Sequence, residues 1–144
     1  MRYVLTILVA LAICCTANGE ERAPTANEEL ALAALEGLMA QPAERALPII
    51  KRVLAGSQTS LVKQRALFVL SQIDSPEAQQ ILVQTSRSTD AALRGEAIRS
   101  IGIGGDPKAL DALLEIYKTG SPEVRQEVLQ AWLTRRLLKM AWPH

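Results

Sequence analysis

The fold of this protein is indicated by residues 93–114, which read LRGEAIRSIGIGGDPKALDALL. Apolar residues recur at helical spacing on both sides of a break at residues 104–107. Gly104 or Gly105 can end one helix, Asp106 can cap the next, and Pro107 fits its first turn. The stretch therefore predicts two helices joined by a tight turn. A phosphate-binding loop would follow a strand, so these glycines are assigned a structural role.

The same pattern returns along the chain with a period of 31 residues, and Val62, Leu93 and Val124 open three equivalent helices. Equivalent core positions are Ala66, Ala97 and Val128, then Leu67, Ile98 and Leu129, then Leu70, Ile101 and Trp132, while Pro76, Ala78 and Leu82 reappear as Pro107, Ala109 and Leu113. A fixed period of this kind is typical of stacked repeats that bury their apolar faces on one another. We therefore expect an all-α fold, a right-handed α-solenoid of about seven antiparallel helices, or three and a half repeats.

The first repeat is assigned by a shift of 32 residues, which places Ala34, Leu38 and Ala46 on Ala66, Leu70 and Ala78. Its first helix, capped by Asn27 or Thr25, is expected to bury one face, namely Leu30, Ala34, Leu35 and Leu38. Its second helix spans residues 43–55, with a kink at Pro48 because proline removes a backbone hydrogen bond. Ala34, Ala66 and Ala97 are expected to let neighbouring helices approach closely.

The last part of the repeat series is expected to be irregular, because no outer helix follows the one that opens at Pro122. Residues 133–142 form a basic amphipathic stretch that contains Leu133, Leu137, Leu138 and Met140 beside Arg135, Arg136 and Lys139. We interpret this stretch as an improvised terminal cap. The alternative is a segment that docks on a partner or on a membrane surface.

The N-terminal residues are typical of a secretory signal peptide. Arg2 provides a positive charge, Val4–Ile13 is an apolar run interrupted only by Thr6, and Cys15–Ala17 offers small residues for cleavage. The run is shorter than the ~20 residues of a membrane-spanning helix, although an uncleaved anchor remains the alternative. We expect a signal peptide at 1–17, a flexible linker at 18–26, a repeat domain at 27–144, and a periplasmic or secreted location.

Composition limits the chemistry that the exported chain can perform. Both cysteines lie in the predicted signal peptide, and the one histidine is His144. Nucleophilic, acid–base and metal chemistry draw mainly on these side chains, so we predict no catalytic residue, no metal site, no cofactor and no enzyme. The carboxylates that remain are assigned to solvent-facing helix positions or first turns, namely Glu28, Glu29, Glu96, Glu123 and Glu127.

Charge argues against a nucleic-acid partner. The chain has 16 basic and 15 acidic residues, and Arg2 leaves with the signal peptide. The remaining chain is therefore neutral and has no overall attraction to nucleic acid or to an anionic membrane. The charges are nevertheless uneven, because residues 20–44 are mainly acidic and residues 125–144 are mainly basic. Membrane contact is expected only if the signal is retained or the basic segment docks.

Positions that vary between repeats while facing one side are the candidates for binding. They form pairs four residues apart on three adjacent helices, namely Gln64 and Phe68, Gly95 and Arg99, and Gln126 and Gln130. We predict that Gln64, Phe68, Arg99, Gln126 and Gln130 contact a protein partner. Phe68 is the one phenylalanine of the chain.

Residues 93–98 and 104–114 resemble the short HEAT-like repeats of bacterial proteins, and the similarity extends over roughly residues 28–132. The resemblance implies that the helices opening at Val62, Leu93 and Val124 line the concave side and that those after Asp-Pro lie outside. It also implies a repeated basic position, Lys63, Arg94 and Arg125, that pairs with acids of neighbouring turns.

The leading hypothesis is an exported, non-enzymatic adaptor that binds an unknown protein along its concave helices. The alternative is head-to-tail self-association, in which the basic end of one copy meets the acidic end of another. A third hypothesis, from resemblance to HEAT-like bilin lyases and HEAT-built hydroxylases, is a lyase-like or small-ligand-binding protein. The hydroxylases hold metal with His-Glu pairs, and this sequence contains none.

Overall fold

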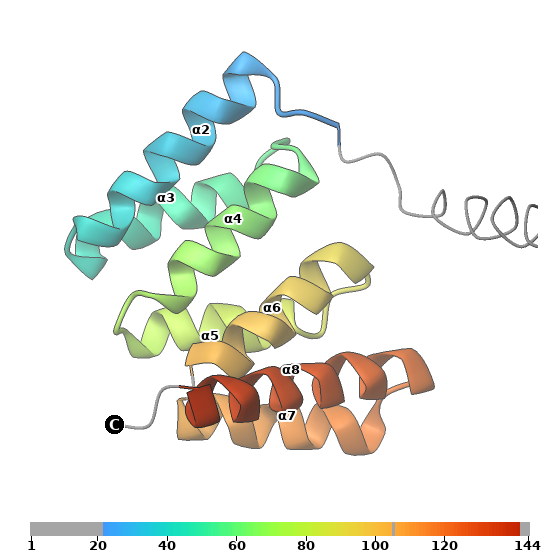
Figure 1. Ribbon diagram of the computed structural model, residues 1–144. Coiled ribbons are helices and arrows are strands. Elements are labelled where there is room, and N and C mark those ends of the chain that lie inside the picture. Colours follow the sequence, from blue (N-terminus) through green and yellow to red (C-terminus); the bar gives the residue numbers. More distant parts are fainter. Residues whose placement is uncertain (1–21, 105, 142–144) are drawn as a thin grey trace, which may run out of the picture.

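The computed structural model describes residues 22–104 and 106–141, and these form seven α-helices and one short 3-10 helix (Figure 1). The elements are α2 (Ala26–Gly37), η1 (Leu38–Ala40), α3 (Ala43–Ala55), α4 (Ser60–Ser71), α5 (Pro76–Thr85), α6 (Ala91–Gly104), α7 (Pro107–Thr119) and α8 (Pro122–Ala141). The all-α fold and the seven predicted helices are confirmed. The predicted signal peptide, with both cysteines, lies outside the described residues, as do Trp142 and His144.

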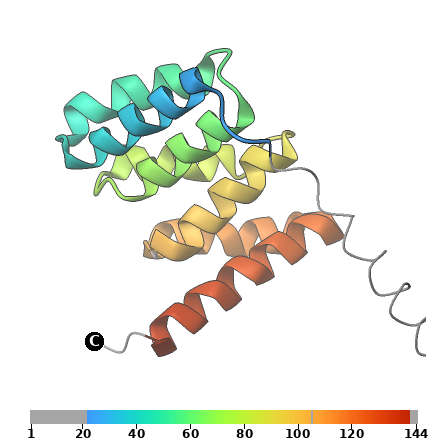
Figure 2. The same ribbon diagram turned by 45° about the horizontal axis from the view of Figure 1, so that its top comes forward.

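The helices stack in two rows, which we call the even row (α2, α4, α6 and α8) and the odd row (α3, α5 and α7). Figures 1 and 2 both show α2 and α8 at opposite ends of the stack. Packing is most extensive between α4 and α6 and between α6 and α8, whereas α5 and α7 touch much less. A stack of helices curves toward the row in which the helices pack more closely. The even row therefore lies on the inner, concave side of the stack.

The core runs between the two rows and follows the repeat. Its fully buried large side chains include Ile50, Val62, Leu67, Leu70, Leu82, Ile98, Ile101, Leu113 and Val128. Ala66 and Ala97 are also fully buried in the even row. Trp132 is half-buried, and its ring lies 5.6 Å from that of Tyr117. The predicted core positions of α4 and α6 are therefore correct.

Some core positions at the two ends of the stack were predicted wrongly. Leu30 and Ala34 of α2 are exposed, Leu30 by 72%, whereas the predicted Leu35 is buried and Glu28 is buried as well. On α8, Leu129 is 48% exposed although the equivalent Leu67 and Ile98 are fully buried. The physical reason is the same in both cases, because each side chain points toward a neighbouring even-row helix that the described chain does not supply.

Arg22 and Thr25, which precede α2, both bind the side chain of Glu28. Thr25 caps the helix in a capping box, in which its backbone N–H donates to Glu28 Oε2 at 2.7 Å and its hydroxyl accepts from the Glu28 N–H. Arg22 donates to both carboxylate oxygens of Glu28 at 2.8 and 2.9 Å. The backbone hydrogen bond from Thr25, together with the other donors, lowers the pKa of Glu28 to about 2. Glu28 thus lies in the first turn of α2, one of the two placements predicted for these carboxylates, and it is buried and paired rather than solvated.

The turns between helices follow the sequence signals in most respects. Asp106 caps α7 by accepting from the Ala109 N–H at 2.9 Å, and Pro107 takes the first helical position. Ser75 also lies at an N-cap before Pro76, but its side chain makes no capping hydrogen bond.

Two helices continue past the positions at which the sequence predicted a change. α3 continues through Pro48 as a single helix, and Pro48 is exposed. Beyond the equivalent end of α6, α8 continues as one helix to Ala141, and the large apolar side chains of residues 133–141 stay exposed rather than covering the core as a cap.

Candidate functional site

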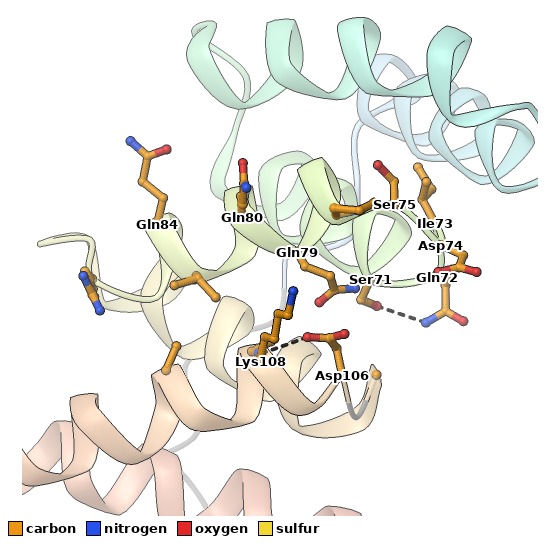
Figure 3. Close-up of a pocket in the computed structure, with 16 residues that line it drawn as sticks. Ser71, Gln72, Ile73, Asp74, Ser75, Gln79, Gln80, Gln84, Asp106 and Lys108 are labelled. Carbon is orange, nitrogen blue, oxygen red and sulfur yellow. Dashed lines mark hydrogen bonds between the residues drawn. The ribbon is translucent and has the colours of Figure 1, made fainter.

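A groove with a volume of about 920 Å³ lies between α5 and α7. Val83 of α5 and Ala109 and Ala112 of α7 line it together with polar side chains. Alanine side chains are short, so at these two positions α7 leaves space between the two odd-row helices. We call this hollow the α5–α7 groove (Figure 3).

The rim of the α5–α7 groove is polar and rich in side-chain amides. Gln72, Gln79, Gln80 and Gln84 line it, and Figure 3 shows Gln79 and Lys108 pointing toward one another across the gap, while Gln80 and Gln84 project away from α7. An amide both donates and accepts hydrogen bonds, as a peptide group does. The rim can therefore satisfy the backbone of an extended chain segment.

The charges around the groove balance. The lining contains two acids, Asp74 and Asp106, and two bases, Arg87 and Lys108. Asp106 already accepts a backbone hydrogen bond as the α7 cap, and Gln72 Nε2 donates to Ser71 Oγ at 3.0 Å. A groove with two acids and two bases has no strong preference for an anion or a cation. Its chemistry favours a neutral polar ligand.

The predicted binding stripe begins on α4 with two half-buried side chains. Gln64 Nε2 donates to Ser60 Oγ at 2.9 Å. Phe68 packs against the core on one side, and the guanidinium carbon of Arg65 lies 5.6 Å from its ring centroid. That distance is within the range of a cation–π contact. Part of the Phe68 ring thus has a local partner, and a role in binding stays a prediction.

The rest of the stripe lies around a smaller hollow of about 310 Å³ between α6 and α8. Gly95, Arg99 and Gln130 line it together with Leu133 and Leu137. The structure therefore brings Arg99 and Gln130 together, as predicted, whereas Gln126 is exposed and not among the lining residues. Arg99 is 60% exposed at its side chain and pairs with Glu96 at 2.7 Å.

The repeated basic position has different partners in each repeat. Arg94 pairs with Glu127 through two hydrogen bonds of 3.0 Å, from Nε and from Nη2, which link α6 to α8. This hydrogen bonding raises the pKa of Arg94, and the charges of Glu127 and Glu123 act in the same direction. The pairing implied by the resemblance is thus present at Arg94. Glu127 is half-buried, so its predicted solvent-facing role was wrong.

The other two members of the basic position do not form this ion pair in the described chain. The equivalent acid for Lys63 is Glu96, which pairs with Arg99 and accepts a hydrogen bond from Ser100. Arg125 donates from Nε to the Tyr117 carbonyl oxygen at 3.2 Å. The three basic side chains therefore do not form a continuous series of ion pairs. The acid equivalent to Glu127 pairs with Arg99 rather than with Lys63, and Arg125 binds a carbonyl oxygen.

No group of three or more His, Cys, Asp or Glu residues is placed to hold a metal ion in residues 22–104 and 106–141. Within the same residues, no helix combines the length and the hydropathy required to cross a bilayer. The two hollows contain neither cysteine nor histidine. Their arrangement supports binding through shape and hydrogen bonds.

Comparison with known families agrees with the two-row stack. The family model described as HEAT repeats matches residues 47–132, which is more than half of the chain. The chain belongs to the HEAT repeat family. Comparison with curated proteins gave no match, and comparison with solved structures gave none either. HEAT repeats generally serve as scaffolds for protein interactions and are usually non-catalytic.

Within this HEAT array, sequence reasoning missed the α5–α7 groove. It compared the helices that open with Val62, Leu93 and Val124, which form the even row, and gave the odd row only a covering role. A signal was nevertheless present, because α5 carries Gln79, Gln80 and Gln84 at consecutive and one-turn spacing, and α7 carries alanine at positions 109 and 112. Of these three amides only Gln79 points toward α7 (Figure 3), so the signal for a polar gap was one amide opposite two alanines.

Proposed function

We propose that this HEAT-repeat protein is an exported, non-enzymatic scaffold that holds an extended segment of a partner protein in the α5–α7 groove. The observation that carries the proposal is the 920 Å³ groove itself, lined by amides and by balanced charges. The lining combines apolar side chains, among them Val83, Ala109 and Ala112, with the amides and charges named above. A peptide segment, which has both apolar side chains and a polar backbone, fits such a mixed lining.

The even row offers a second surface for the same function. Arg99 and Gln130 border the hollow between α6 and α8, which is about one third as large. Gln64, Phe68 and Gln126 extend that surface over the neighbouring even-row helices. Binding along this inner side is the arrangement expected from the sequence, and the experiment below separates it from binding in the groove.

The first part of the test identifies the partner. A photo-crosslinking amino acid is placed at Gln79 in the groove, at Gln130 on the even row, and at Lys118 on the exposed side of α7 as a control. Cross-linked proteins are recovered from cells and identified by mass spectrometry. We expect one foreign protein to be enriched from the Gln79 position and absent from the Lys118 position. The recovered chain should begin after Ala17 and come from the exported fraction.

The second part measures binding of the purified partner by calorimetry. The groove variant is Gln79→Ala with Lys108→Ala, and the even-row variant is Phe68→Ala with Arg99→Ala. The matched control is Glu115→Ala with Lys118→Ala, an exposed ion pair on α7. We expect the groove variant to weaken binding at least tenfold, and the control to leave it unchanged. Weakening by the even-row variant alone would assign the partner to the inner side and refute the groove.

A further inference from the structure

One face of α8 is left uncovered by the described chain. Leu129, Leu133, Leu137 and Met140 are spaced so as to share this face, and they are 48%, 57%, 53% and 61% exposed. Leu129 occupies the position of Leu67 and Ile98, both fully buried. Ile98 shares a helical face with Gly95 and Gly102, which approach Glu127 and Ala131 of α8, so this face of α6 is turned toward the next even-row helix. α8 thus presents a core face without its neighbour.

The opposite end of the even row has the matching feature. Leu30, Ala33, Ala34 and Gly37 of α2 are all exposed. In the repeat register they correspond to Val124, Glu127, Val128 and Ala131 of α8, and two of these, Glu127 and Ala131, contact α6. Glu127 binds Arg94, and Ala131 lies beside Gly102. α2 therefore presents the face with which an even-row helix normally packs on the preceding one.

We propose that the exposed face of α2 in one copy of this protein packs on the exposed face of α8 in another, so that the copies continue one stack head to tail. The contact repeats the geometry by which α8 packs on α6. Leu133 stands at the position of Gly102, and Gly37 stands at the position of Ala131. Leu133 of one copy then contacts Gly37 of the other, and the leucine side chain fills the space left by the glycine, which has no side chain.

Charge complements the two faces. Acidic residues on α2 are Glu28, Glu29 and Glu36, and α2 contains no basic residue, whereas α8 has four basic residues and two acids. In the repeat register Arg125 corresponds to Arg94 and Glu29 corresponds to Glu123, whose charge acts on Arg94 within one copy. The joined stack would place Glu29 of the second copy near Arg125. Opposite charges on two faces direct which ends meet.

The last two turns of α8 also have a counterpart. They extend beyond the part of α8 that matches α6, and they carry Leu137 and Met140. In the joined stack they would lie over η1, where Met39 is 44% exposed. Lys139 would come toward Glu44, the acidic residue in the first turn of α3. The proposed contact therefore covers the apolar residues that both ends expose.

The contact is heterologous, since two different faces meet, and this gives a specific test. The protein is purified with the N-terminus that processing in the cell leaves. Its mass is measured by sedimentation over a range of concentrations at low salt. Leu133→Arg blocks the α8 face, Ala34→Arg blocks the α2 face, and Leu114→Arg on α7 is a control at an exposed leucine. Circular dichroism verifies that each variant keeps its helicity, because all three positions are exposed.

We expect the wild type and Leu114→Arg to grow in mass with concentration, and each blocked variant to stay monomeric. An equimolar mixture of the two blocked variants should double in mass, because each retains the one face that the other lacks. A monomeric wild type at every concentration would overturn the proposal. Self-association of Ala34→Arg alone would also overturn it, because α8 would then be pairing with α8.

Discussion

Helices α6 and α8 approach each other closely at Gly102, and this leads to a sharp prediction. A β-carbon built at Gly102 of α6 would lie 2.9 Å from Ala131 Cβ, 3.1 Å from Ala131 O and 3.3 Å from Ala131 C on α8. Non-bonded carbon atoms are most stable about 3.5–4.0 Å apart. Gly102→Ala therefore forces α8 away by roughly 0.6 Å or more, and backbone atoms of Ala131 leave no side chain that could simply rotate aside.

Gly95 provides the matched control in the same helix. A β-carbon there would approach nothing nearer than the Glu127 side chain, at 4.0 Å. Replacing glycine by alanine inside a helix stabilises it by about 1 kcal/mol, and this gain is common to both variants. The difference between Gly95→Ala and Gly102→Ala in free energy of unfolding thus isolates the overpacking, for which we expect about 1–3 kcal/mol.

Urea denaturation followed by circular dichroism measures that difference. Gly95→Ala should be at least as stable as the wild type, and Gly102→Ala should be the less stable of the two. In the Gly102→Ala background, Ala131→Gly should destabilise less than it does in the wild type, because it removes the β-carbon contact. Equal stabilities of the two alanine variants would refute the close approach of α6 and α8.

Three further predictions concern the core and its charges. Ile98→Ala should lower the free energy of unfolding by about 2–5 kcal/mol in urea denaturation. Leu129→Ala, at the equivalent but exposed position, should change it by less than about 0.5 kcal/mol. Equal losses in the two variants would contradict the difference in burial. Because the folded pKa of Glu28 is about 2 against an ordinary 4.5, its stabilising contribution is complete above pH 4.5 and is lost as the pH falls toward 2. The thermal midpoint of the wild type should therefore fall more steeply across that window than that of Glu28→Gln, and parallel profiles would contradict this. A double-mutant cycle of Arg94→Met and Glu127→Gln should give a coupling free energy of about 1 kcal/mol, since the ion pair is bidentate and half-buried. A coupling free energy near zero would show that the pair does not stabilise the contact between α6 and α8.

Much of the fold could be predicted from local signals. Asp106 and Pro107 marked the start of α7, and the repeat identified Ala66 and Ala97 as buried. These predictions succeeded because capping and helical periodicity act within a few residues of one another. The candidate site was predicted less well. Gln130 and Arg99 do meet around one hollow, but the larger groove depends on Val83, Ala109 and Ala112, which come from separate helices.

The sequence by itself determined which face of each helix is apolar and that these faces recur with a constant period. It could not determine which of the equivalent faces is covered. Leu67, Ile98 and Leu129 share one position in the repeat, and only the first two are buried. Burial requires a neighbour on the other side, and the neighbour is supplied by stacking. The tertiary structure therefore decided where the core ends, where α5 and α7 separate, and which leucines remain at the surface.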